Sequence, residues 1–198
     1  KGAIVLMNPQ TGEVYAMVSQ PSFDSSNLRE EWNTYVDNPD SPFLNRATNG
    51  LYAPGSTFKV VTALAALEKP NVEKTYKCNG SIVVDGYKLK DYGGEAHGTV
   101  DLREALVKSC NSYFAQMGLQ IGKDKLGEVA EKFMVNKNIP FDLPVKKSTF
   151  PYREGLGKTD LAAASIGQGK VLMTPLNMAL IASAIGNDGN MVKPILVK

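Results

Sequence analysis

The sequence predicts a mixed α/β fold in which a mainly antiparallel sheet packs against several helices. Two short apolar runs, residues 3–7 and 14–18, are joined by a turn-rich segment and predict a β-hairpin. An almost wholly apolar run over residues 60–68 has the length of a helix that is buried on most sides. Helical patterns dominate the second half of the chain.

Between the hairpin and the apolar helix, residues 21–49 are rich in Ser, Asn, Asp and Pro and predict a long irregular excursion. Excursions of this length are usually functional or partly mobile. A second hairpin is predicted over residues 81–89, because Asp85-Gly86 favours a tight turn between two runs with strand character.

Residues typical of helix starts and helix ends divide the second half of the chain into several predicted helices. Asp101 to Glu104 has the reciprocal pattern of a capping box, which predicts a helix over residues 105–108. Thr159-Asp160 and Thr174-Pro175 each predict a helix start. The expected helices are residues 112–121, which Gly122 stops, and residues 125–134, 161–166 and 176–185.

The composition is that of an ordinary globular protein. With 198 residues, 43% hydrophobic and 21% charged, the chain is expected to form one domain over residues 1–198 with a sizeable core. A net charge of +2 without a basic run argues against a nucleic-acid partner. No apolar stretch has membrane-spanning length, and the start at Lys1 inside a strand-like pattern suggests a segment of a longer polypeptide.

The two cysteines and the single histidine give weak signals. The spacing of Cys78 and Cys110 fits no zinc or redox motif, and two buried thiols are favoured over a disulfide, although pairing stays open. His97 lies in a turn-like stretch, which favours a solvated or capping role over membership of a Ser-His-Asp triad.

Ser56 and Lys59 form a Ser-x-x-Lys pair at the start of the apolar helix. Residues three apart on a helix share a face, so the Lys59 amine is expected beside the Ser56 hydroxyl, where a base can activate a weak nucleophile. Pro54-Gly55 marks the helix start, which puts Ser56 at the N–H-rich end. Taken alone, the pair arises by chance roughly once in such a chain, and a capping Ser with a snorkelling Lys is the favoured interpretation.

Ser109-Cys110-Asn111 falls at the junction between two predicted helices. A Ser-x-Asn there can present a hydroxyl able to relay a proton and an amide able to bind a peptide carbonyl, whereas local capping is favoured for the motif alone. Ser25-Ser26-Asn27 has the same pattern but precedes Ser56 and lacks flanking apolar helices, so it is rejected.

In combination, these segments resemble the transpeptidase domain of penicillin-binding proteins of the class B type, and the resemblance runs along nearly all of the chain. It implies the penicillin-binding-protein and serine β-lactamase fold, an antiparallel sheet flanked by helices with a helical subdomain that carries residues 109–111. The matching segments, in the family's order, are residues 2–13, 46–59, 97–102 with 109–111, and 166–169 with 174–176.

The resemblance implies a peptidoglycan D,D-transpeptidase. Ser56 would be the nucleophile that forms the acyl-enzyme, Lys59 its general base, Ser109 the proton relay to the leaving amine, and Asn111 the residue that holds the substrate backbone. Peptidoglycan stem peptides ending in D-Ala-D-Ala, β-lactams that acylate Ser56, and other cell-wall synthesis proteins would be the partners. No metal or organic cofactor is implied, and the parent protein would be membrane-anchored at the extracytoplasmic face of the bacterial membrane.

The chain departs from the family in one respect. The family's Lys-Thr-Gly motif is absent before Lys198, and residues 157–160 are rejected as a substitute because they lead into a helix and lack the final glycine. The C-terminal strands are therefore expected to be missing and the fragment alone to have little activity. A D,D-carboxypeptidase, a serine β-lactamase that uses Glu154 to activate water, and a non-catalytic penicillin sensor or scaffold domain stay open as alternatives.

Overall fold

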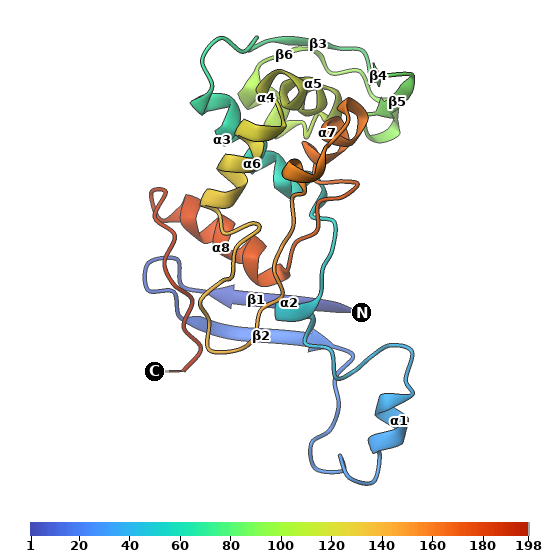
Figure 1. Ribbon diagram of the computed structural model, residues 1–198, viewed down its shortest axis with the longest axis vertical. Helices are drawn as coiled ribbons and strands as arrows, with labels where there is room; N and C mark the ends of the chain where they lie inside the picture. The colour runs from blue at the N-terminus through green and yellow to red at the C-terminus, as the bar shows by residue number, and fades with distance from the viewer. Residues whose placement is uncertain (198) are drawn as a thin grey trace. The chain divides into compact units, whose positions relative to one another are not determined.

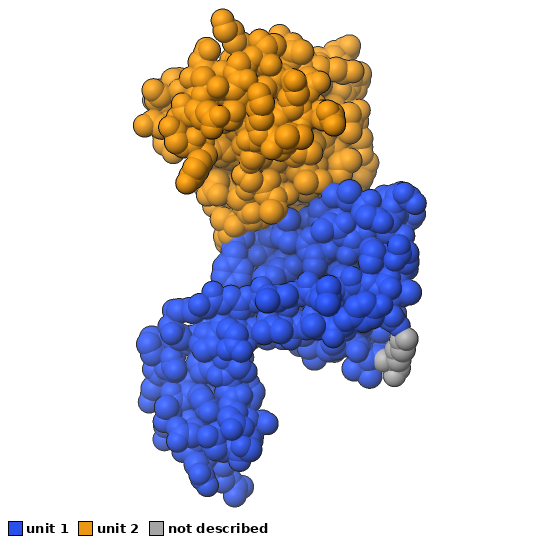
Figure 2. All heavy atoms as spheres, turned by 180° about the vertical axis from the view of Figure 1, so that it is seen from behind, with its two compact units in different colours: residues 1–52, 137–148, 173–198 blue, residues 53–136, 149–172 orange. Residues whose placement is uncertain are grey.

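The computed structural model describes residues 1–197, which divide into two compact units (Figure 2). The first unit contains residues 1–52, 137–148 and the part of the chain from residue 173 onward, and the second contains residues 53–136 and 149–172. The expectation of a single domain over residues 1–198 stays a prediction, and Lys198 lies outside the described residues. In that described part, no helix is long and apolar enough to cross a bilayer.

In the first unit, β1 (Gly2–Met7) and β2 (Val14–Gln20) form the predicted antiparallel hairpin, and α8 (Pro175–Gly186) packs against β1 (Figure 1). Gly12, in the turn of the hairpin, has a φ of 79°, and a Cβ at this position would lie 2.1 Å from the carbonyl oxygen of Lys193. Only glycine therefore allows the segment at residue 193 to run beside this turn.

The segment between β2 and the second unit is more ordered than the sequence predicted. It contains α1 (Trp32–Val36) and α2 (Arg46–Asn49), so the prediction of an irregular excursion over residues 21–49 is wrong for these two stretches. The ring of Phe43 has three aromatic neighbours whose centroids lie 4.9 to 5.7 Å away, namely Phe23, Trp32 and Tyr35. The buried Arg46 guanidinium donates to three backbone carbonyls, those of Asp40, Ser41 and Leu44. Turn-forming residues alone could not reveal these contacts.

In the second unit, α3 (Lys59–Glu68) lies at the centre and packs against α4 (Leu102–Val107), α5 (Asn111–Ile121) and α6 (Lys123–Lys132). Most of α3 is buried, as its apolar sequence predicts. α5 also packs closely against α7 (Lys158–Ala164), because a Cβ at Gly118 would lie only 1.7 Å from Ser165 Oγ. The same segment is tied to α3, since Thr62 Oγ1 donates to the carbonyl of Ser165 at 2.8 Å.

Most of the helix signals are confirmed. Asp101 and Glu104 form the predicted capping box, α5 ends at Gly122 with a φ of 82°, and the Thr174 side chain caps α8. The predicted start of α7 at Thr159-Asp160 is wrong, because the helix begins at Lys158 after Gly157 without a side-chain cap.

Four short strands complete the second unit. β4 (Ser81–Val84) and β5 (Tyr87–Lys90) form the predicted hairpin, in which Asp85 and Gly86 have φ angles of 46° and 81°. β3 (Tyr76–Cys78) pairs with β6 (Gly98–Val100), with Cys78 opposite Gly98. This second pairing has no signal in the sequence, and it brings the end of β3 next to the segment that precedes β6.

Candidate active site

Ser56 lies on a 3-10 turn, Gly55–Phe58, that runs directly into α3 at Lys59. Residues three apart in a 3-10 turn are eclipsed, so Ser56 and Lys59 lie on the same side of the turn. Ser56 is exposed, whereas Lys59 has no exposed surface. The fully buried Phe58 ring, stacked on Phe150 with centroids 6.0 Å apart, anchors the turn between them.

The loop after α7 holds the Ser56 turn in place. The backbone N–H of Gly55 donates to the carbonyl of Gly167 at 2.8 Å. Gly167 has a φ of 71°, and a Cβ there would lie 2.1 Å from the Gly55 carbonyl oxygen and 2.8 Å from Phe58 Cβ. Gly167 is thus the residue that allows the loop to reach the nucleophile turn. The sequence alone places Gly167 only within the matching segment at residues 166–169 and assigns it no role of its own.

The Lys59 amine is held by the turn that connects α4 and α5. Lys59 Nζ donates to the Ser109 carbonyl at 2.5 Å, to Ser109 Oγ at 3.0 Å and to Asn111 Oδ1 at 2.7 Å. In the part of the chain that the structure describes, none of the hydrogen bonds of this amine reaches Ser56. Lys59 and Ser56 lie on the same side of the turn, but the amine donates its hydrogen bonds to three other oxygen atoms and not to the Ser56 hydroxyl.

Burial also changes the acidity of this amine. It lowers the pKa of Lys59 from 10.5 to about 8, against the opposing attraction of the negative charge at Asp91. At pH 7 about one tenth of such a group is neutral, compared with about one in three thousand at the ordinary pKa. A lysine in this state can accept a proton near neutrality, as a general base requires.

The Ser109-Cys110-Asn111 turn presents its outer two side chains to Lys59, as its predicted place between two helices suggested. Ser109 has a φ of 52°, an uncommon backbone conformation for a residue with a side chain. The Asn111 amide is fixed from both ends, because its Nδ2 donates to the Lys90 carbonyl at 2.9 Å while its Oδ1 accepts from Lys59. The Cys110 side chain caps α5 through the backbone N–H of Tyr113.

Asp91 is the residue that sequence reasoning missed. This carboxylate is 3% exposed and accepts hydrogen bonds from the backbone N–H of Asn111 at 2.5 Å and of Ser112 at 3.3 Å, as well as from Ser112 Oγ. Burial favours its protonated form, but the hydrogen bonds from Ser112, Cys78 and Asn111 outweigh burial and hold the pKa of Asp91 below its usual value. Asp91 thus fixes the first turn of α5, and no motif in the sequence signals it.

Ser56, Ser109 and Asn111 line one pocket of about 540 Å³. Three of the four predicted site residues therefore face a common space, and the fourth, Lys59, hydrogen bonds to two of them. Glu154 is exposed on a separate 3-10 turn and is not among the lining residues. The rejected Ser25-Ser26-Asn27 lies in the other unit, where Ser26 bonds to Asp24 within a local turn.

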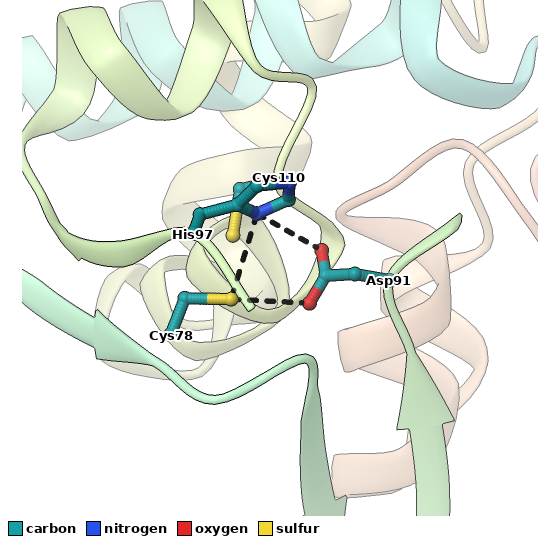
Figure 3. Close-up of side chains that lie close together, drawn as sticks. All are labelled: Cys78, Asp91, His97 and Cys110. Carbon is teal, nitrogen blue, oxygen red and sulfur yellow. Dashed lines mark hydrogen bonds and ion pairs between the residues drawn. The ribbon is translucent and has the colours of Figure 1, made fainter. Parts of the chain in front are cut away.

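The side chains of Cys78, Asp91, His97 and Cys110 converge (Figure 3), and Asp91 and His97 are also among the residues that line this pocket. One donor atom from each lies within 4.8 Å of the others, an arrangement that could hold a metal ion. Both cysteines are free and buried, which confirms the favoured interpretation of two thiols. The solvated or capping role predicted for His97 is wrong, because its side chain is only 9% exposed and lies 3.5 Å from Cys78 Sγ.

The comparisons with known proteins agree with this geometry. The family model described as the penicillin binding protein transpeptidase domain matches residues 2–198. The peptidoglycan D,D-transpeptidase PbpA of Mycobacterium tuberculosis is 41% identical over 219 residues, which cover all of this chain and 43% of the relative. The chain therefore spans less than half the length of this curated relative.

Solved structures lead to the same fold. The ceftriaxone acyl-enzyme complex of penicillin-binding protein A from M. tuberculosis has a TM-score of 0.91 and 39% identity, covering all of this chain and 47% of that one. The complex of penicillin-binding protein PBP2 with MreC from Helicobacter pylori has a TM-score of 0.90 and 27% identity, covering 98% of this chain and 39% of that one. The predicted mixed α/β fold is confirmed by these similarities.

Proposed function

The chain belongs to the family of penicillin-binding-protein transpeptidase domains, and we propose that the protein containing it cross-links peptidoglycan stem peptides through an acyl-enzyme at Ser56. The observation that carries the proposal is the hydrogen-bonded set formed by Lys59, Ser109 and Asn111 beside the exposed Ser56. Lys59 lies 50 and 52 residues before its two side-chain partners. Those partners line one pocket together with Ser56. Local capping of α5 does not explain why the buried Lys59 lies at the centre of this hydrogen-bonded set.

In the proposed reaction, Ser56 Oγ attacks the carbonyl of the penultimate D-alanine, and its proton passes to neutral Lys59. Ser109, whose hydroxyl accepts from Lys59 Nζ at 3.0 Å, relays a proton to the leaving amine of the terminal D-alanine. An amine of a second stem peptide then attacks the ester, which forms the cross-link and restores the Ser56 hydroxyl. The backbone N–H of Ser56 supplies one donor for the oxyanion, and Asn111 positions the substrate backbone.

The fixed position of the Asn111 amide gives its role a physical basis. Its Oδ1 accepts from Lys59 and its Nδ2 donates to the Lys90 carbonyl, so the amide plane cannot rotate freely. Nδ2 carries a second hydrogen. We assign this second hydrogen to a peptide carbonyl of the stem peptide, a contact that a rotating side chain would hold less firmly.

The proposal is tested by intact mass spectrometry of the protein that contains this chain after incubation with benzylpenicillin. A β-lactam opens its ring on acylation and loses no group, so the mass should rise by the whole antibiotic. We expect Ser56→Ala to abolish this adduct and Ser25→Ala, in the rejected Ser-x-Asn segment, to retain it. An unmodified wild-type protein, or an adduct that survives Ser56→Ala, contradicts the proposal.

Product analysis then separates transpeptidation from its chemical neighbours. With a donor stem peptide and an acceptor amine, we expect the cross-linked product to dominate; free terminal D-alanine without a cross-link would indicate a carboxypeptidase. Rapid turnover of nitrocefin would indicate a β-lactamase. Acylation of Ser56 without any peptide product would indicate a sensor.

We also propose that the parent protein is membrane-anchored and works at the extracytoplasmic face of the membrane with other cell-wall synthesis proteins. The PBP2–MreC complex of the relative from H. pylori supports such partners. Labelling of intact cells by a membrane-impermeant fluorescent penicillin, blocked in a Ser56→Ala strain, tests the location. Labelling only after lysis contradicts it.

A further inference from the structure

A second pocket, of about 450 Å³, adjoins the pocket that Ser56 lines. The two pockets share three lining residues, Lys90, Asp91 and Gly93, and both lie within the second unit. The remaining wall of the second pocket comes from the turn before β4, from β4 and β5 and from the loop after β5, namely Asn79, Gly80, Ser81, Lys88 and Gly94. None of the side chains that line only this second pocket takes part in the proposed acyl transfer.

Strand β5 presents two lysines to the second pocket. Lys88 and Lys90 are two residues apart, so their side chains lie on the same face of the strand. Leu89, between them, is 7% exposed and faces the interior, whereas both lysines are exposed. Ser81 pairs with Lys90 across the hairpin, which puts its hydroxyl on the lysine face. Two ammonium groups and one hydroxyl therefore line the same pocket.

The end of β5 is held beside the residue proposed to bind the substrate backbone. The carbonyl of Lys90 accepts from Asn111 Nδ2 at 2.9 Å, and the backbone N–H of Asp91 donates to the Gly80 carbonyl at 3.0 Å. A Cβ at Gly80 would lie 2.3 Å from the carbonyl oxygen of Gly94, so only glycine allows the loop after β5 to lie so close. The lysine side chains thus start from a backbone that is fixed relative to Asn111.

The charges of the two pockets differ. In the part of the chain that the structure describes, neither Lys88 nor Lys90 belongs to an ion pair. Asp91 lines both pockets, but its carboxylate already accepts from Ser112, from Cys78 and from backbone N–H groups. The exposed Glu95 lines the Ser56 pocket and not the second one. An anionic group in the second pocket can therefore form charge-assisted hydrogen bonds with both lysines.

From this arrangement we propose that Lys88 and Lys90 bind a carboxylate of the donor stem peptide that lies upstream of its D-Ala-D-Ala end. The inference rests on the proposed acyl transfer, in which Ser56 and Asn111 hold that end in the first pocket. The upstream residues then continue past Asn111, where the end of β5 lies. The anionic groups of a peptide are carboxylates, so the site prefers donors with a free upstream carboxylate over donors that carry an amide there.

The first test compares carbenicillin with benzylpenicillin, which lacks one side-chain carboxylate but is otherwise the same. The acyl side chain of a penicillin takes the place of the upstream peptide, so the ratio of the two second-order acylation rate constants reports the subsite. In the protein that contains this chain, we expect Lys90→Met to lower this ratio about two- to fivefold, because an exposed ion pair is lost. Lys90→Arg should retain the ratio, as should Lys77→Met, an exposed lysine on β3 that lines neither pocket.

The sign of the charge gives a sharper test. Glu95→Gln is expected to raise the ratio, because it removes a negative charge from the adjoining pocket. Added salt should lower the ratio of the wild type and have less effect on the double variant Lys88→Met/Lys90→Met. Equal ratios in the wild type and this double variant overturn the proposal. A ratio that falls in Glu95→Gln as it does in Lys90→Met also contradicts it, since opposite charges must act in opposite directions.

Direct binding separates this proposal from the acyl transfer. Ser56→Ala protein is titrated in a calorimeter with a stem peptide whose upstream carboxylate is free and with the same peptide amidated at that position. We expect the free form to bind more tightly, about two- to fivefold for each lysine, and the difference to vanish when both lysines are replaced by methionine. Equal binding of the two peptides, with normal acylation of the wild type, overturns the subsite alone. Charge-dependent binding without any acylation of the wild type supports the subsite and contradicts the proposed acyl transfer.

Discussion

The pH dependence of acylation offers a sharp test of the role of Lys59. Replacement of Asn111 by aspartate exchanges an amide oxygen 2.7 Å from Lys59 Nζ for a carboxylate oxygen of nearly the same shape. At an effective dielectric constant of about 20, Coulomb's law gives about 6 kcal/mol for two unit charges at this distance, or about four pKa units, as an upper bound. Opposite charges at such distances usually shift a pKa by about one to three units, so we expect the pKa of Lys59 to rise by that amount.

The assay is the second-order rate constant for acylation by benzylpenicillin between pH 6 and 10, which reports groups of the free enzyme. With the pKa of Lys59 at about 8, the wild-type rate should rise about tenfold per pH unit below about pH 7 and level off above pH 9. In Asn111→Asp the midpoint should move upward by about one to three units, because the carboxylate keeps Lys59 protonated. Asn71→Asp, the same exchange at an exposed turn, should leave the midpoint in place.

The pH midpoint of the acylation rate, and not its maximal value, tests whether Lys59 is the base. Asn111→Asp also loses the donor to the Lys90 carbonyl, and it alters the residue proposed to hold the substrate, so its maximal rate should fall in any case. Neither loss moves the pH at which the rate is half-maximal. A wild-type rate that is flat between pH 6 and 9, or equal midpoints in the wild type and Asn111→Asp, would refute Lys59 as the base.

Stability measurements test the surrounding packing. Gly167→Ala should lower the melting temperature and slow acylation, because a Cβ there would lie 2.1 Å from a carbonyl oxygen of the nucleophile turn, whereas Gly157→Ala, with no atom within 4 Å, should do neither. Thr62→Val, which leaves a buried carbonyl without its donor, should cost about 1–3 kcal/mol of unfolding free energy, and the exposed Thr99→Val almost none. The pKa of Lys59 lies near 8 in the folded chain and 10.5 in the unfolded chain, which therefore binds more protons between these values. Relative to Lys59→Met, the unfolding free energy of the wild type should thus rise with pH through this window by up to about 3 kcal/mol. Equal pH slopes in the two proteins would contradict the altered pKa.

The features that the sequence predicted well depend on neighbouring residues. A capping box at Asp101 and Glu104, a tight turn at Asp85-Gly86 and a proline after Thr174 each act within one turn of chain, so their residue types carry the information. The Ser-x-x-Lys pair of Ser56 and Lys59 is also a local feature, because both the spacing of the two residues and the apolar run that follows them can be read from neighbouring positions.

The features that the sequence could not predict depend on contacts between distant segments. The acceptors of the Lys59 amine lie 50 and 52 residues further along the chain, and nothing in the composition reveals that this lysine has no exposed surface. His97 is taken for a solvated residue because a three-residue strand such as β6 gives no periodic signal. Its burial follows only from the pairing of β3 with β6.

The middle residue of the Ser-x-Asn motif explains how the two regions of the site are connected. Ser109 has a positive φ and Asn111 begins α5, so the backbone changes direction at Cys110. The outer side chains therefore bond to Lys59, while the Cys110 thiol lies in the buried cluster with Asp91, which also accepts from the N–H of Asn111. Cys110 therefore connects the buried cluster to the site, because a movement of its backbone also moves Ser109 and Asn111, the two residues whose side chains bond to the Lys59 amine.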